Sequence, residues 1–179
     1  MPSALLTVVY GDLTPVLLRL SQRLAQRQVV ASEQAVIVVE DPNPEATPHV
    51  MGDRDLLLYA GDETPGPEVD GGGEWDTRSH AKLLLVARSR SELDEMGRSR
   101  QILTNPTGGH YAFRGLVRRA VQLFFADDGM FGHNLLLTQP ARWQGTRGPV
   151  RDRKDPTWVS STLTFEVVYE VDLERPTTP

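Results

Sequence analysis

The chain has 179 residues with 39% hydrophobic and 24% charged residues, a composition that predicts one folded domain rather than a disordered chain. Its formal net charge of −5 argues against a protein that mainly wraps nucleic acid, because neutralising phosphates requires a surplus of Lys and Arg. The absence of cysteine excludes disulfides and thiolate chemistry. The lack of a long apolar run or a basic leader predicts neither a membrane span nor a signal peptide.

The first elements predicted are a helix and a short strand. Residues 3–10, "SALLTVVY", fit either a strand or an extended lead-in to the helix. Asp12 and Thr14 are both good N-caps and Pro15 suits a first turn. An amphipathic helix over residues 13–28 is predicted by the spacing of Leu13, Val16, Leu17, Leu20 and Leu24. The β-branched run "QAVIVVED" predicts a strand, and the proline-rich residues 41–48 stop it.

The middle of the chain predicts a long β-hairpin. "RDLLLYAG", residues 54–61, reads as a buried strand, and the return strand is "WDTRSHAKLLLVARS", residues 75–89. Between them, residues 62–74 hold two prolines and three consecutive glycines, which predicts a flexible loop. The glycine run lacks the pattern and the following helix of a phosphate-binding loop.

A second amphipathic helix is predicted from residue 111 to a stop at Gly129. Its polar face would carry Arg114, Arg118 and Arg119, and its apolar face Phe113, Leu116, Val117, Ala120, Val121 and Phe124. After a short strand in "HNLLLTQP", residues 141–156 are interpreted as a basic loop. The last strand then places on one face Leu163, Phe165, Val167, Tyr169 and Val171, with Val168 as the exception on the other face.

Strands cluster along the chain instead of alternating strictly with helices, which favours the α+β class. The expected architecture is a mostly antiparallel β-sheet with two main amphipathic helices packed on one face and a long hairpin loop. We expect residues 1–179 to form a single domain with a flexible C-terminal tail at about residues 174–179.

Residue patterns for catalysis or metal binding are weak. His49, His80, His110 and His133 never share a helical turn or an HxH pair, so no metal site is predicted. No serine lies in a nucleophile elbow. The sequence therefore predicts a protein that is not an enzyme and has no cofactor. One alternative stays open, a small hydrolase whose acidic residues, such as Asp53, Asp55 and Asp128, meet only in the fold.

The basic loop is the one local charge anomaly. Trp143 and Trp158 flank a surplus of basic residues, namely Arg142, Arg147, Arg151, Arg153 and Lys154. Aromatic and basic side chains together suit single-stranded nucleic acid, so a small binding module is a second alternative. A solvated loop or a protein–protein contact explains the same residues.

Two stretches resemble one protein family. In "DPTWVSSTLTFEVVYEVDL" a loop of mixed charge leads to a tryptophan, two serines and a long strand, as in the C-terminal strand of the tail terminator proteins of long-tailed bacteriophages. The matching residues are Arg151, Asp152, Arg153, Asp155, Trp158, Ser160, Ser161, Leu163, Thr164, Phe165, Tyr169 and Glu170. Residues 55–87 are similar to the central hairpin of the same family, with a strand that closes on Tyr59 and a return strand that begins at Trp75.

The resemblance implies a structural virion protein that forms a six-fold ring on the tail tube, terminates tail polymerisation and joins tail to head. Related neck, tail-completion and head–tail connector proteins share the small α+β fold and stay open as alternatives. The implied partners are further copies of the chain in a homohexamer, the tail tube protein and a head-completion protein, with DNA passing through the lumen and no membrane. The implied location is the tail or neck of the virion, reached from the host cytoplasm during assembly.

The two loops would supply the ring contacts. The hairpin loop contributes Asp62, Glu63, Glu68, Asp70, Glu74 and Trp75. The basic loop contributes Arg142, Trp143, Arg147, Arg151, Arg153, Lys154 and Trp158. Charges of mixed sign at such contacts set orientation and specificity more than affinity.

Overall fold

The computed structural model describes residues 14–31, 35–38, 52–65, 78–90, 109–127, 135–137 and 141–171. The helices are α2 (Thr14–Gln26) and α4 (His110–Asp127). The strands are β1 (Val36–Val38), β2 (Arg54–Pro65), β3 (Arg78–Arg90), β4 (Leu135–Leu137), β5 (Arg142–Arg151) and β6 (Trp158–Val171). The predicted strands in "QAVIVVED", "RDLLLYAG" and "HNLLLTQP", the return strand and the last strand are all present.

The strands form one six-stranded sheet in the order β1-β2-β3-β6-β4, with β5 also paired to β6. Only the β1–β2 pair is parallel, and the other pairs are antiparallel. The strand β6 is bonded to β3 along one edge, while its other edge is shared by β5 near Trp158 and β4 near Val171. The class is therefore α+β with a mostly antiparallel sheet, as the sequence predicts.

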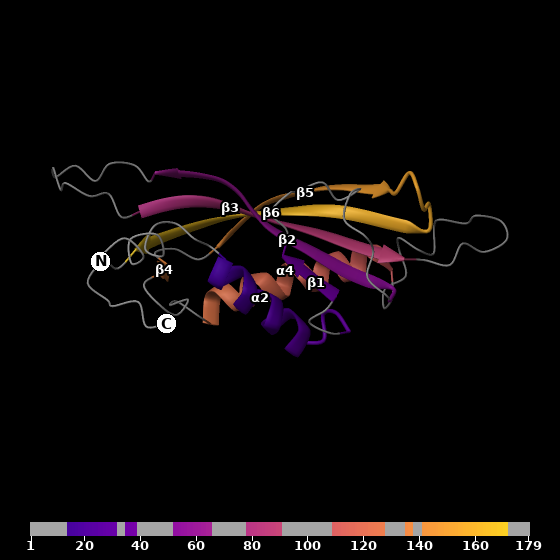
Figure 1. Cartoon of the computed structure of the whole chain (residues 1–179), viewed down its shortest axis with the longest axis horizontal. Helices are drawn as coiled ribbons and strands as arrows, with labels where there is room; N and C mark the ends of the chain where they lie inside the picture. The colour runs from indigo at the N-terminus through magenta and orange to yellow at the C-terminus, as the bar shows by residue number, and fades with distance from the viewer. Residues whose placement is uncertain are drawn as a thin grey trace, which may run out of the picture.

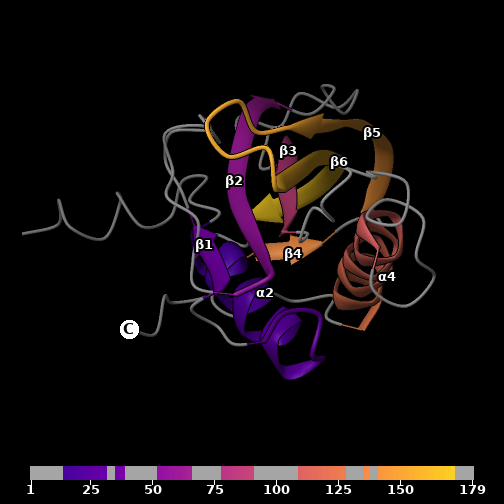
Figure 2. The ribbon, with the colours of Figure 1, turned by 90° about the vertical axis from the view of Figure 1, so that its right-hand side faces the viewer.

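Both helices cover the same face of the sheet (Figures 1 and 2). Alternate residues of β2, β3 and β6 point towards them, because successive side chains of a strand leave on opposite faces. On β6 these residues are Leu163, Phe165, Val167 and Tyr169, each at most 2% exposed. They join one core with Leu20 and Leu24 of α2 and with Phe113, Val117, Val121 and Phe124 of α4. The hairpin of β2 and β3 extends past both helices at one end of the molecule (Figure 1).

The C-terminus of α2 is closed by the backbone. The Val29 amide donates to the Leu24 carbonyl at 3.1 Å and the Gln28 amide to the Ala25 carbonyl at 2.9 Å. Gln28 has a φ of 55°, the left-handed conformation that this helix-ending motif requires and that glycine usually supplies. Leu24 and Val29 are both buried, so the motif also fixes the turn against the core.

The segment interpreted as a basic loop is in large part a strand, and the loop prediction is wrong from Arg142 to Arg151. This strand, β5, pairs with β6 from Glu166 to Val159. Register shifts occur between Trp143 and Gly145 and between Arg147 and Val150. Gly148 has a φ of +97°, and a Cβ there would lie 2.9 Å from the Ser160 carbonyl oxygen. Glycine and proline suggested a loop, but an edge strand accepts both at bulges.

The expected apolar face of the second helix is correct except for one residue. Leu116 is 47% exposed, whereas its neighbour Val117 is fully buried. The exposed position follows from helix geometry, because Leu116 lies one residue, or about 100°, away from Val117 on the helical wheel. Leu18 of α2 is likewise 50% exposed.

Several predictions concern residues outside the described part of the chain. These are the strand or lead-in at residues 3–10, the proline-rich stretch at 41–48, the tip of the hairpin loop, the helix stop at Gly129 and the tail at about 174–179.

Two leucines of α2 provide a test of the core. We expect Leu20→Ala to lower the free energy of unfolding by about 3 kcal/mol, because a buried leucine loses its packing and leaves a cavity. Leu18→Ala, the same change on the exposed side of the helix, should cost less than about 0.5 kcal/mol. Urea denaturation followed by circular dichroism measures both, and equal losses would contradict the orientation of α2.

Candidate functional site

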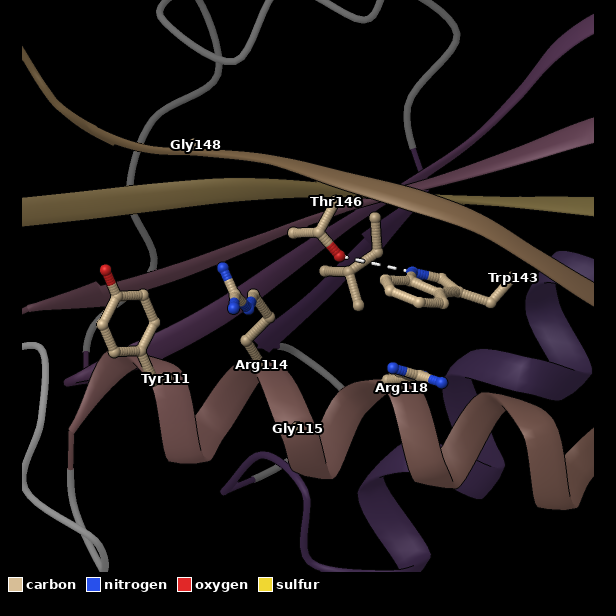
Figure 3. A pocket seen from close by; sticks show the side chains of 8 residues that line it. Tyr111, Arg114, Gly115, Arg118, Trp143, Thr146 and Gly148 are labelled. Atoms are coloured by element: carbon tan, nitrogen blue, oxygen red, sulfur yellow. Dashed lines mark hydrogen bonds between the residues drawn. The ribbon is translucent and has the colours of Figure 1, made fainter.

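A groove with a volume of about 520 Å³ lies between α4 and β5. It is lined by Tyr111, Arg114, Gly115 and Arg118 from α4, Trp143, Thr146 and Gly148 from β5, and Leu163 from β6. Figure 3 shows that the side chains of Tyr111 and Arg114 point from α4 towards β5. Trp143 and Thr146 of β5 point towards α4. The groove exists because β5 bends around the edge of the sheet towards α4 (Figure 2).

Arginine side chains in the groove stack on aromatic rings. The guanidinium carbon of Arg118 lies 3.7 Å from the centre of the Trp143 ring, and that of Arg114 lies 4.8 Å from the centre of the Tyr111 ring. The Trp143 indole nitrogen also donates to the Thr146 hydroxyl at 3.3 Å, which orients the ring. A stacked guanidinium keeps its N–H groups in its own plane, where they can bind a carboxylate or phosphate through two hydrogen bonds.

The positive charge of this surface is not balanced locally. No carboxylate among the described residues lies within ion-pair distance of the two groove arginines or of Arg142, Arg147 and Arg151 on β5. The three β5 arginines are exposed. The carboxylate of Glu166, opposite Arg142 in the ladder, instead accepts from Gln144 at 2.8 Å and lies 3.3 Å from the His80 ring nitrogen. The groove can therefore bind an anionic group supplied from outside the described fold.

The predicted contact residues fall into separate places. Arg142, Trp143, Arg147 and Arg151 lie on β5, whereas Arg153 and Lys154 are exposed in the turn before β6. The loop prediction is wrong from Asp62 to Pro65, because β2 continues to Pro65 in its ladder with β3. Asp62 and Glu63 are exposed on this part of β2, where Lys82 lies 3.8 Å from Asp62 and the Tyr169 hydroxyl donates to Glu63. The loop residues Glu68, Asp70, Glu74 and Trp75 are outside the described residues.

The two tryptophans of the basic segment do not form one site. Trp143 is 38% exposed in the groove, whereas Trp158 is 4% exposed and belongs to the interior. On β6, Trp143 is opposite Phe165, seven positions from Trp158. The Trp158 ring is therefore not part of the exposed contact surface of this fold, and a platform built from both rings is not formed.

The acidic residues of the hydrolase alternative do not meet in a shared pocket. The Asp55 carboxylate accepts from Arg88 Nε at 2.5 Å and from Arg88 Nη2 at 2.8 Å, and each residue is 1% exposed. This bidentate pair joins neighbouring strands directly, since Asp55 is opposite Arg88 in the β2–β3 ladder. Asp53 is exposed, and Asp128 is outside the described residues. Asp55 thus has a structural partner instead of a free carboxylate.

A buried polar cluster at the start of α4 was not predicted. The His110 Nδ1 atom lies 2.7 Å from the Ser89 hydroxyl on β3, and Nε2 lies 2.8 Å from the Ser161 hydroxyl on β6. A neutral imidazole has one donor and one acceptor, and a hydroxyl can be either, so both bonds are satisfied without charge. Burial, with a smaller contribution from the positive charge of Arg114, lowers the pKa of His110 to about 4. All three residues are at most 3% exposed, so the cluster ties helix to sheet and presents no accessible nucleophile.

Sequence reasoning missed the groove and this cluster for different reasons. Arg114 and Arg118 were recognised as the polar face of a helix, but the segment that covers them was interpreted as a loop. His110 was assessed only for metal-ligand spacing, whereas its two partners are 21 and 51 residues away in the chain.

Within the described ranges, no group of three histidine, aspartate or glutamate residues is placed to hold a metal ion. No described helix combines the length and the apolar character needed to cross a membrane. No protein-family model matches the chain, and no curated protein sequence matches it. The assignment of a function therefore depends on the geometry of these residues.

The buried ion pair provides a test. Asp55→Ala should lower the free energy of unfolding by about 3–5 kcal/mol, because it leaves the Arg88 guanidinium buried without its carboxylate. Asp62→Ala, which removes the exposed pair with Lys82, should cost less than about 1 kcal/mol. Chemical denaturation at pH 7 measures the loss in both variants. Equal losses would contradict a stabilising role of the buried pair of Asp55 and Arg88.

The His110 cluster predicts a pH dependence. The folded state holds the pKa of His110 at about 4, below its ordinary value of 6.5, so the unfolded chain binds more protons between these values. The contribution to stability is complete above pH 6.5 and falls as the pH drops towards 4, by roughly 3 kcal/mol in all. Urea unfolding at pH 7 and pH 5 measures the loss, and His110→Gln should remove this part of the slope. An unchanged slope in that variant would show that another group is responsible.

Proposed function

We propose that the chain is a structural ring protein of the tail of a long-tailed bacteriophage, most similar in role to a tail terminator. In that role, copies of the chain form a closed ring on the tail tube, stop its growth and present a surface to the head. Other neck and tail-completion proteins with a small α+β fold have the same requirement for a ring and differ in which neighbours they contact.

The observation that carries the proposal is the outer edge of β5. Among the described residues β5 pairs only with β6, so no described strand occupies its other edge. Most of its side chains are exposed, including Val150 at 59% and Trp143 at 38%. A long strand edge with exposed apolar side chains favours pairing with another chain, and a ring satisfies every such edge by a neighbour.

The distribution of rigid and protruding parts also supports this role. The sheet and both helices share one core, which fixes the position of α4 and β5 relative to the hairpin. The hairpin extends beyond the helices at one end (Figure 1), where it is available to another subunit. A ring protein needs such protruding contacts on a rigid body, and it needs no catalytic group.

The first experiment asks whether the purified chain caps tail tubes. We expect native mass spectrometry to detect closed oligomers, either of the chain alone or after mixing with tubes. Negative-stain imaging should then show rings at tube ends. A strict monomer that does not associate with tubes of several long-tailed phages would contradict the proposal.

A pair of variants tests the β5 edge within this experiment. Val150→Lys places a charge on the exposed edge strand and should reduce ring formation by at least about tenfold, because lysine on an edge opposes strand pairing. Leu18→Lys, a similarly exposed residue on α2, should leave ring formation unchanged. The reverse result would move the subunit contact from β5 to the helical face.

A further inference from the structure

The groove between α4 and β5 contains positive charge that has no carboxylate partner among the described residues. Arg114 and Arg118 each have one face covered by an aromatic ring, which leaves the edges of both guanidinium groups free to donate. Neither lies within ion-pair distance of a carboxylate among the described residues. The stacked arrangement also reduces the entropy that each side chain loses when it binds an anion, because its conformation is already restricted.

An extended peptide fits this site better than a nucleic acid. The Trp143 and Tyr111 rings already have arginines over one face, so they do not form an open platform for stacked bases. The groove is instead bordered by β5, whose outer edge pairs with no described strand; this edge can add a backbone partner while the arginines bind the carboxylates of that partner. The expected ligand is therefore an extended acidic segment of protein.

The chain itself contains such a segment. Residues 66–74, which follow β2, include three acidic residues and no basic ones: Glu68, Asp70 and Glu74. The segment leaves β2 at the end of the sheet where Pro65 and Ser79 pair, and Ser79 is opposite Tyr169 on β6. The groove lies beside Leu163 of β6, which is six residues, or roughly 20 Å, along the strand from Tyr169.

We infer that the groove binds the acidic segment 66–74 of a second copy of this chain. The segment follows Pro65 at the end of β2, and the groove lies roughly 20 Å away along β6, so one copy can offer its segment to one neighbour and its groove to another. Such a head-to-tail contact generates a ring when the rotation between copies closes. This contact would join neighbouring subunits of the ring. The choice of a second copy as the occupant of the groove rests on the proposed function.

A peptide experiment tests the groove directly. The protein is the full-length variant Glu68→Lys, Asp70→Lys, whose own segment can no longer fill a neighbour's groove. The probe is a fluorescent peptide of residues 61–76, followed by anisotropy. We expect binding that weakens as salt is raised, and at least about tenfold weaker binding of a peptide in which Glu68, Asp70 and Glu74 are replaced by their amides.

Matched variants of α4 locate the binding site. Adding Arg118→Gln to the test protein should weaken peptide binding by at least about tenfold, since the guanidinium that pairs with the carboxylate is lost. Adding Arg119→Gln, the exposed neighbour outside the groove lining, should change it by less than about twofold. Circular dichroism confirms that each variant is folded.

A charge exchange tests the contact between whole chains. Arg114→Glu, Arg118→Glu reverses the groove, and Glu68→Lys, Asp70→Lys reverses the segment. Each variant alone should associate at least about tenfold more weakly than the parent chain in native mass spectrometry. Their mixture should regain association, because a reversed groove then meets a reversed segment.

Three results would overturn the inference. The first is equal binding of the acidic and neutralised peptides, and the second is unchanged peptide binding in the Arg118→Gln variant. The third is displacement of the peptide by a 20-nucleotide oligo(dT) whose own binding requires Arg118. That result would assign the groove to nucleic acid. These outcomes are independent of the ring proposal. Tube capping that survives in the Arg114→Glu, Arg118→Glu variant rejects the groove contact but not the ring, whereas specific peptide binding without tube capping rejects the tail assignment but not the groove.

Discussion

The pairing of β6 on both of its edges is the constraint on which the rest of the structure depends. Thirteen residue pairs align β3 with β6, from Arg78 opposite Glu170 to Arg90 opposite Trp158. On the other edge, β5 covers the first part of β6 and β4 covers its end. A one-residue slip would turn Leu163, Phe165 and Val167 away from the helices, so the buried face fixes the register. The longest strand is thus central in the sheet although it is last in the described chain.

The same register positions two buried polar contacts near one end of the sheet. Asp55 and Arg88 pair on the face away from the helices, and the adjacent Ser89 turns to the helix side to meet His110. His110 also reaches Ser161 of β6, so the start of α4 is joined to both central strands. The hydrogen-bonded neutral imidazole fixes α4 at its N-terminus, and the apolar residues from Phe113 to Phe125 then direct the helix along the sheet. The position of Arg114 and Arg118 under β5 follows from this attachment.

The surface formed by α4 and β5 differs in charge from the chain as a whole. The chain has a net charge of −5, yet the surface formed by α4 and β5 is rich in arginine. Bulges at Gly145 and Gly148 bend β5 towards α4 and bring Trp143 of β5 over Arg118 of α4. Asp62 and Glu63 lie near the end of β2, and Glu68, Asp70 and Glu74 follow them in the sequence. If the groove binds this segment of a second copy, as inferred above, a closed assembly of copies would satisfy both the groove and the segment.

The sequence by itself determined the α+β class, the two helices, the hairpin and the alternation of β6, because these depend on local periodicity and on turn residues. It did not reveal β5, since the glycines and the proline of an edge strand resemble those of a loop when no partner strand is visible. The sequence predicts that Trp158 and Trp143 share a contact surface. In the structure Trp158 is buried on β6, which pairs with both β3 and β5, whereas Trp143 on the edge strand β5 is exposed. Only the tertiary structure decided that Asp55 meets Arg88, that His110 lies between two serines, and that α4 and β5 enclose a basic groove. These contacts join residues 21 to 51 positions apart in the chain, and their geometry is set by strand register and helix packing, which no local pattern encodes.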